Sequence, residues 1–303
     1  MTDNNMTEAA QSLALKISSL IGELNQLNTP ISGLRLSRWP MPTEPTSYMH
    51  GPSVCLIAQG KKCVVVGEEH YTYDPFHFLI SAVDLPVMSN IIEATIDSPF
   101  LGIVMKLDLQ VISQLIVDSQ IGSNQKHKAH KGIAIGNITV PLFNAFERLL
   151  DLMDEPDSIE ILAPIIKKEI FYRLLMTNQG TRLSQMVTEG SHSHHIAKAI
   201  DWLKDHYTKP LNVVMLATES GMSKSAFYHH FREITAMTPL QFQKKLRLNE
   251  ARRLMLTENL DAATTTFKVG YESQSQFNRE YKRMFGHPPA RDIKIFREMN
   301  VNV

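Results

Sequence analysis

Cysteines are few in this sequence, and long apolar runs are missing from it. Its 303 residues include two cysteines, Cys55 and Cys63, too few for a disulfide framework, so reduced thiols are expected. No stretch approaches the ~18 consecutive apolar residues of a membrane span, which argues against a membrane partner. The start, MTDNNMTEAAQ, is polar and slightly acidic, unlike a secretory signal. These absences favour a cytoplasmic globular protein.

The common signatures of enzymes are also missing. The sequence contains no nucleophile elbow, P-loop, HExxH motif or glycine-rich dinucleotide fingerprint. We therefore expect a protein that is not an enzyme and that needs no cofactor. A β-barrel catalytic domain fused to helices is the enzyme alternative.

The net charge is zero only as a sum over two unlike halves. Residues 1–194 carry 14 Lys and Arg against 20 Asp and Glu, whereas residues 195–303 carry 17 against 11. A basic half beside an acidic half is typical of a protein in which the basic domain binds a polyanion. A solvated basic surface is the other interpretation.

The first half has the pattern of a β-rich domain with helices around it. Residues 7–27 have apolar residues at helical spacing, and prolines then forbid regular helix across a connecting segment at 30–52. From 53 to 109, short β-branched runs alternate with breaks, which predicts a small antiparallel sheet or barrel. Amphipathic helices over 141–153 and 157–176 should form a hairpin on this sheet. The broad apolar face of the hairpin either forms a homodimer surface or only covers the core of the sheet.

The second half has a helical pattern throughout. Segment 177–195 is rich in Gly, Ser, Thr and His and is interpreted as a linker. Residues 196–296 show helical spacing and no strand signal. An α+β half is therefore expected to precede an all-α half.

A helix-turn-helix pattern begins near Val213. Leu216 faces inward, Gly221 can take the positive φ of a sharp turn, and Ser223 is a good N-cap for the next helix. In that helix Phe227 and Phe231 lie four residues apart on one face. This order of helix, glycine turn and capped helix predicts a motif at about 213–234.

The same pattern recurs 49 residues later. Gly270 is the second turn, a helix starts around Ser273, and Phe277 and Tyr281 repeat the aromatic spacing, which predicts a second motif at about 261–284. Between the copies, PLQFQKKLRLNEARRLML predicts a connector helix of about 16 residues, or roughly 24 Å. Such a rod could hold two recognition helices about one duplex turn (~34 Å) apart.

These residues closely resemble a known family. The stretch GMSKSAFYHHFREITAMTPLQFQKKLRLNEARRLML…VGYESQSQFNREYKRMFGHPPA is similar to the AraC/XylS-type DNA-binding domain. SVCLIAQGKK, with Asp84-Leu85-Pro86 and Ser98-Pro99, resembles an AraC-type N-terminal sensor. Two departures are Thr265-Thr266, where Ile-Ala often stands, and Ala236, where glycine often stands.

The resemblance implies a fold and a function. The fold would be a small β-barrel-like (cupin-like) sensor with packed helices, at 1–190, the end of a linker at 191–195, and a DNA-binding domain at 196–296. The function would be that of a bacterial, sequence-specific transcription regulator that responds to a small-molecule effector. Its partners would be double-stranded DNA, a second copy of the chain, and RNA polymerase if it is an activator. An architectural DNA-binding protein without a ligand is the alternative.

The base-reading side chains should project opposite the aromatic residues of each recognition helix. The expected base contacts are Ser225, Tyr228, His229, Gln274, Ser275, Asn278 and Arg279. The expected phosphate contacts are Lys224, Arg232 and Lys282. Arg279 suits bidentate reading of guanine. We expect Phe227, Phe231, Phe277, Tyr281, Leu246 and Leu254 in the core, while Lys244, Lys245, Arg247, Arg252 and Arg253 on the connector either approach DNA or face solvent.

Histidines and cysteines invite other hypotheses. His192, His194 and His195 lie in the expected linker, and His70 and His77 lack the spacing of a metal-binding strand, so no metal site is expected. The two cysteines flank an expected hairpin turn at Gln59-Gly60, on the same or on opposite faces according to the length of the turn. They are either small buried residues or a thiol sensor.

Overall fold

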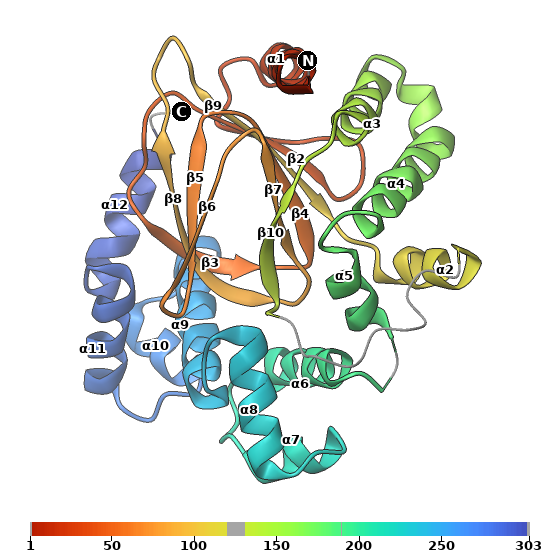
Figure 1. Cartoon of the computed structure of the whole chain (residues 1–303). Helices are drawn as coiled ribbons and strands as arrows, with labels where there is room; N and C mark the ends of the chain where they lie inside the picture. The colour runs from red at the N-terminus through yellow and green to blue at the C-terminus, as the bar shows by residue number, and fades with distance from the viewer. Residues whose placement is uncertain (1, 120–130, 189, 302–303) are drawn as a thin grey trace.

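The structure, a computed structural model, describes residues 2–119, 131–188 and 190–301. Two antiparallel sheets pack face to face in the first half, and a group of helices forms the second (Figure 1). The six-stranded sheet has the order β1 (Gln26–Asn28), β2 (Leu34–Trp39), β9 (Phe100–Lys106), β4 (Ser53–Gln59), β7 (His77–Ser81), β10 (Ile133–Asn137). The four-stranded sheet has the order β3 (Thr46–His50), β8 (Leu85–Glu93), β5 (Lys61–Val66), β6 (Glu69–Tyr73). The α+β fold class is confirmed.

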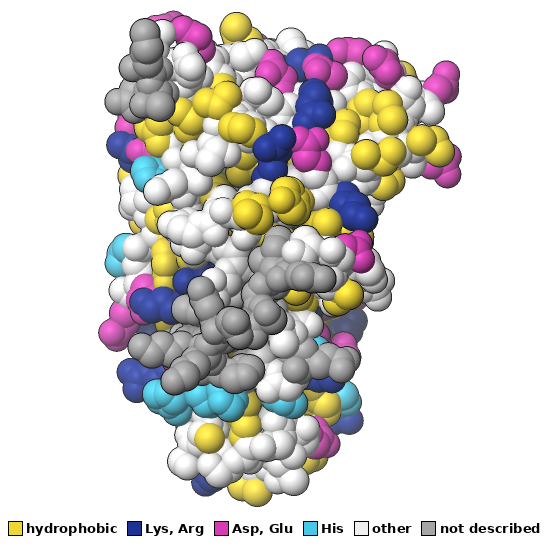
Figure 2. Space-filling model, turned by 45° about the vertical axis from the view of Figure 1, so that its right-hand side comes forward, with side chains coloured by type: hydrophobic (Ala, Val, Ile, Leu, Met, Phe, Trp, Pro, Cys, Tyr) yellow, Lys and Arg dark blue, Asp and Glu magenta, His cyan; other side chains and the backbone are white. Residues whose placement is uncertain are grey.

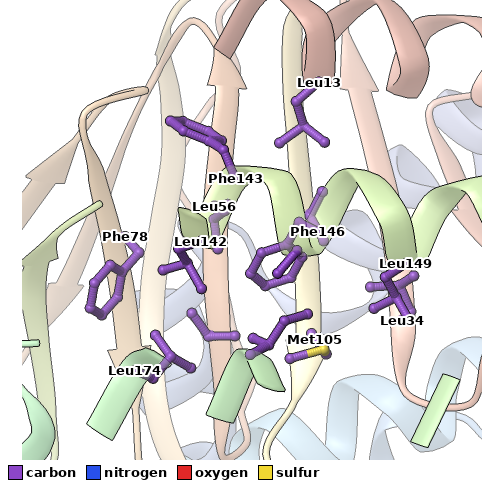
Figure 3. Close-up of a cluster of buried hydrophobic side chains, with 14 of the residues drawn as sticks. Leu13, Leu34, Leu56, Phe78, Met105, Leu142, Phe143, Phe146, Leu149 and Leu174 are labelled. Atoms are coloured by element: carbon purple, nitrogen blue, oxygen red, sulfur yellow. The ribbon is translucent and has the colours of Figure 1, made fainter. Parts of the chain in front are cut away.

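Helices cover the outer face of the six-stranded sheet. The helices of this half are α1 (Thr2–Ile21), α2 (Leu109–Ser119), α3 (Val140–Asp151), α4 (Ile159–Leu175) and α5 (Gly180–Val187), with 3-10 turns at Leu152–Asp154 and Pro156–Ser158. Figure 3 shows Phe143 and Phe146 of α3 among side chains of the sheet such as Leu56 and Met105. The expected helical hairpin is thus confirmed as α3 and α4.

The central strand β4 is buried on both faces. Val54 and Leu56 pack under the helices, whereas Cys55 and Ile57 face the second sheet. Burial on both sides explains why this strand has a continuous apolar sequence, SVCLIAQ, instead of an alternating one.

The structure corrects three local expectations. The proline-rich segment 30–52 is more than a connection, because it forms β2 and β3, which pair with β9 and β8. Gln59-Gly60 is not a hairpin turn, because β4 and β5 belong to different sheets and the chain crosses between them at Gly60, where φ is +87°. Instead of a linker, segment 177–195 contains α5 and the first residues of α6 (His192–His206), and Leu183 and Met186 bury one face of α5.

The second half consists of seven helices within the described residues. They are α6 (His192–His206), α7 (Val213–Glu219), α8 (Lys224–Thr235), α9 (Pro239–Thr257), α10 (Ala262–Lys268), α11 (Gln274–Phe285) and α12 (Pro289–Val301). No helix among the described residues has the length and apolar character that crossing a membrane requires.

The two halves share a hydrophobic core. Ile57 of β4 and Phe227 and Phe231 of α8 belong to one cluster of buried side chains. The amide of Gly132 donates a hydrogen bond to the carbonyl of Ile234 at the end of α8, with an N···O distance of 2.7 Å. Contacts of this kind join the β-sandwich directly to the first helix-turn-helix motif.

A second inter-domain contact uses the Asp-Leu-Pro motif. Lys204 of α6 donates a hydrogen bond to Asp84, with a distance of 2.7 Å between Nζ and Oδ2. Burial alone would lower the pKa of Lys204, but Asp84 raises it above its ordinary value. Lys204 is therefore held in its charged form against the β-sandwich.

Candidate DNA-binding surface

The first helix-turn-helix motif consists of α7 and α8. Gly221 has a φ of +63°, as its place in the turn requires. The hydroxyl of Ser223 accepts a hydrogen bond from the amide of Ala226 at 3.2 Å and caps α8. The ring centroids of Phe227 and Phe231 are 5.6 Å apart, and both rings are fully buried. The opposite face of α8 is left free for recognition.

The second motif, α10 and α11, repeats these features. Gly270 has a φ of +85°, and the Ser273 hydroxyl accepts a hydrogen bond from the amide of Gln276 at 3.3 Å. The buried rings of Phe277 and Tyr281 lie 5.5 Å apart. The capped turns and aromatic residues that the sequence predicts are therefore present in both motifs.

The expected base-reading side chains lie mostly on the free faces of α8 and α11. Ser225, Tyr228, His229, Gln274, Ser275 and Arg279 are exposed, as are the expected phosphate contacts Lys224, Arg232 and Lys282. Asn278 is half-buried, and its Oδ1 is shielded without a hydrogen-bond partner among the described residues. Their contacts with DNA stay predictions.

The connector helix α9 is longer than expected. It has 19 residues, which at 1.5 Å per residue gives about 28 Å. Thr238 and Gln241 form a capping box at its start. Leu246 and Leu254 are buried, as expected.

Most cations of α9 tie the second motif together, a role that sequence reasoning missed. Arg247 donates hydrogen bonds to the carbonyls of Tyr207 and Gly270, each at 2.7 Å. Lys244 lies 2.7 Å from Glu280 of α11. Burial alone would raise the pKa of Glu280, but hydrogen bonds from Lys244 and from Tyr271 lower it. Arg247 and Lys244 therefore bind partners within the protein.

The two departures from the family pattern have structural consequences. Thr265 and Thr266 are fully buried in α10. The Thr266 hydroxyl donates to the carbonyl of Ala262 at 2.7 Å, whereas the Thr265 hydroxyl has no partner in the described chain. Ala236 ends α8 with a φ of +56°, a conformation that glycine adopts more readily.

The interior of the β-sandwich contains a small polar cluster that includes Cys55. The buried His50 lies 3.1 Å from the Ser53 hydroxyl and 3.7 Å from the Cys55 sulfur. Burial raises the pKa of the Cys55 thiol, which disfavours the reactive thiolate. Burial also lowers the pKa of His50 to about 3, so this ring is neutral at pH 7.

The other cysteine faces outward from its sheet. Cys63 is half-buried, with its sulfur 4.0 Å from Nδ1 of His70, and it forms no disulfide with Cys55. Cys55 and Cys63 therefore lie on different sheets and in different surroundings. The thiol-sensor hypothesis remains a prediction, and exposure favours Cys63.

A cleft of about 560 Å³ lies between the four-stranded sheet and the helices of the second half. The sheet contributes Ser47 and Met88, and the turn between β5 and β6 contributes Glu68. The helices α8, α9 and α11 contribute Arg232, Lys245 and Arg283, among others. The cleft thus opens beside an expected phosphate contact, Arg232.

Comparisons with known proteins match both halves. The model of the AraC-type transcriptional regulator N-terminus matches residues 30–182, and a helix-turn-helix domain model matches residues 216–294. The regulator CdhR of Pseudomonas aeruginosa is 24% identical over 151 residues, which cover 50% of this chain and 45% of CdhR. The thermoregulatory protein LcrF of Yersinia pestis is 24% identical over 173 residues, 57% of this chain and 62% of LcrF. The chain thus spans about half to two thirds of the length of these relatives.

A solved structure has the same fold over most of the chain. ToxT from Vibrio cholerae superimposes with a TM-score of 0.59 at 11% identity, covering 86% of this chain and 98% of ToxT. Another ToxT structure, with an unsaturated fatty acid bound, gives a TM-score of 0.55 at 11% identity, covering 88% of this chain and 97% of ToxT. The matching family consists of transcription regulators and not of enzymes. The chain belongs to the AraC-type transcriptional regulator family.

Proposed function

We propose that the chain is a cytoplasmic bacterial transcription regulator that reads DNA with α8 and α11. The observation that carries this proposal is the repetition of one capped helix-turn-helix unit at both ends of α9, each copy with an exposed polar face. Residues 1–190 would serve as the sensor and residues 196–296 as the DNA-binding domain. RNA polymerase would be a further partner if the protein is an activator.

Selection from a pool of random duplexes tests this proposal. Two recognition helices on one rod should enrich a site with two short conserved segments about one helical turn, ~10 base pairs, apart. An architectural protein would instead bind selected and random duplexes alike, through salt-dependent contacts with phosphates. Failure to enrich any sequence would contradict sequence-specific reading.

We infer that the effector binds in the cleft between the two halves. Lys245 lines the cleft, burial lowers its pKa, and it forms no ion pair within the described residues. Apolar atoms of Val65, Met88 and Leu248 line the same cleft. A carboxylic acid with an apolar tail would match this lining, and the fatty acid bound to ToxT belongs to that class.

Titration calorimetry with oleate, an unsaturated fatty acid, tests the cleft. Saturable binding should become at least tenfold weaker in Lys245→Met, because the carboxylate loses its cation. Lys198→Met removes an exposed lysine of α6 and should leave binding unchanged. Equal binding by both variants, or no binding by the wild-type chain, would reject this site and ligand class.

We also propose that α4 forms the homodimer surface. One stripe of this helix is apolar and exposed. It consists of Ile161, Ile165, Tyr172 and the C-cap residue Met176, whose spacing places them on the same side. Figure 2 shows hydrophobic side chains gathered on the upper part of the molecule, where α3 and α4 lie in Figure 1. A two-fold axis would pair this stripe with its copy.

The double substitution Ile161→Glu and Ile165→Glu should produce monomers, because charges would enter an apolar interface. Sedimentation velocity measures the change in mass. The matched control is Leu15→Glu, which places a charge at another exposed apolar position, on α1. A dimer that survives the double substitution would mean that α4 only covers the sheet.

A further inference from the structure

Three potential metal ligands lie together on the recognition helix of the first motif. His229, His230 and Glu233 have ligand atoms that all lie within 4.8 Å of one another. Nε2 of His229 and Nδ1 of His230 are 3.7 Å and 3.4 Å from the same oxygen, Oε2 of Glu233. At 100° per residue, Glu233 lies one turn along α8 and between the directions of the two histidines. The helix therefore directs all three side chains to one point.

These distances suit a tetrahedral metal ion. Zinc bonds of about 2.0–2.2 Å to nitrogen and oxygen, with tetrahedral angles, separate neighbouring ligand atoms by roughly 3.4 Å. The two separations from the Glu233 oxygen are close to that value. Because all three ligand atoms lie within 4.8 Å of one another, side-chain rotations would complete such a site.

The surroundings of His230 give a second indication of a ligand at this point. Its Nδ1 is shielded from solvent and makes no hydrogen bond among the described residues, although Glu233 is near. The His230 ring is stacked on His192 of α6, with centroids 4.0 Å apart and planes 15° apart. This stacking fixes the plane of the ring, and Nδ1 of His230 lies 3.4 Å from Oε2 of Glu233. Figure 2 shows histidine side chains gathered low on the molecule, where α6 and α8 lie in Figure 1.

We propose that His229, His230 and Glu233 bind a divalent metal ion such as Zn²⁺. The two imidazoles are borderline nitrogen donors that suit Zn²⁺ better than Mg²⁺ or Ca²⁺, which prefer oxygen ligands, and a carboxylate is a common further ligand of zinc. A water molecule would complete the tetrahedron, because three protein ligands are present. This site differs from the histidine groups of the sequence analysis, for which no metal was expected, because only the turn of α8 brings its ligands together.

Metal binding would alter DNA reading. This step rests on the proposed function, in which His229 is a base contact. A metal ion coordinated by Nε2 of His229 would prevent this atom from forming a hydrogen bond with a base. The metal-bound chain should therefore discriminate less between its selected duplex and a scrambled one.

The first experiment measures metal binding without DNA. Zn²⁺ is titrated into the untagged full chain by calorimetry, and Co²⁺ reports a tetrahedral site by its visible absorption. Glu233→Gln and His230→Asn should each weaken binding at least tenfold while the helical circular dichroism is kept. Glu219→Gln, an exposed acid on α7, is the matched control and should bind as the wild-type chain does. Equal binding by wild type and Glu233→Gln, or no binding by wild type, overturns the site.

The second experiment measures DNA binding with and without one equivalent of Zn²⁺. The ratio of affinities for selected and scrambled duplexes should fall several-fold in the wild-type chain and stay constant in Glu233→Gln. An unchanged ratio in the wild-type chain overturns the coupling, although the metal site stands. Failure to discriminate without metal would instead count against the proposed function.

Discussion

Replacing Asp292 with alanine should destabilise the second helix-turn-helix motif by about 3–5 kcal/mol. Asp292 of α12 is buried and accepts hydrogen bonds from Arg252 of α9 at 2.9 Å and 3.0 Å. It also accepts one from the Tyr281 hydroxyl at 2.8 Å. Burial, together with Asp292, raises the pKa of Tyr281, so this hydroxyl stays a donor. Without the carboxylate, Arg252 would be a largely buried charge, with 14% of its side chain exposed, and would lose this counter-ion.

Hydrogen–deuterium exchange of α11 and α12 measures this loss. Amides that exchange through opening of the motif should exchange at least a hundredfold faster in Asp292→Ala, as 3 kcal/mol implies. Glu272→Ala removes an exposed acid of the same motif and should change stability by no more than about 0.5 kcal/mol. Unchanged exchange in Asp292→Ala would mean that the buried pair contributes little.

Arg279→Ala should cost about 1–3 kcal/mol on the selected duplex and relax the preference at one base pair. Arg279 is exposed in the second turn of α11, on the face opposite Phe277. Its guanidinium can donate two parallel hydrogen bonds to one guanine, which alanine cannot replace.

Affinities for a panel of duplexes, each with one base pair changed, measure this preference. Lys282→Ala is the matched control: loss of a phosphate contact should weaken all duplexes alike and reduce the salt slope by about one. If Arg279→Ala also weakens every duplex equally, Arg279 contacts a phosphate and the reading face of α11 is wrongly assigned.

The sequence predicted the features that depend on neighbouring residues. Gly221 and Gly270 adopt the positive φ that their turns need, and Ser223 and Ser273 cap the helices that follow. These signals are local, because a cap or a turn involves residues only three or four positions apart. Helix spacing likewise located α3 and α4.

The features that the sequence could not predict depend on distant residues. Strand β2 exists because it pairs with β9, about 65 residues away, and proline-rich surroundings concealed it. Arg247 and Arg252 were equally consistent with a DNA-facing or a solvated surface until their partners on other elements were known. Electrostatic pairing across a fold leaves no periodic trace in a sequence. The cleft and the shared core of the two halves also form between residues that are distant in the sequence, so neither could be predicted from it.

Fluorescence anisotropy with the selected duplex and a scrambled duplex of equal length measures sequence reading most directly. At physiological salt the wild-type chain should bind the selected duplex about a thousandfold or more tightly than the scrambled one. Raising the salt concentration should weaken both, since both include phosphate contacts. Equal affinities with equal salt slopes would contradict base reading by α8 and α11 and would leave only non-specific attraction to the DNA backbone.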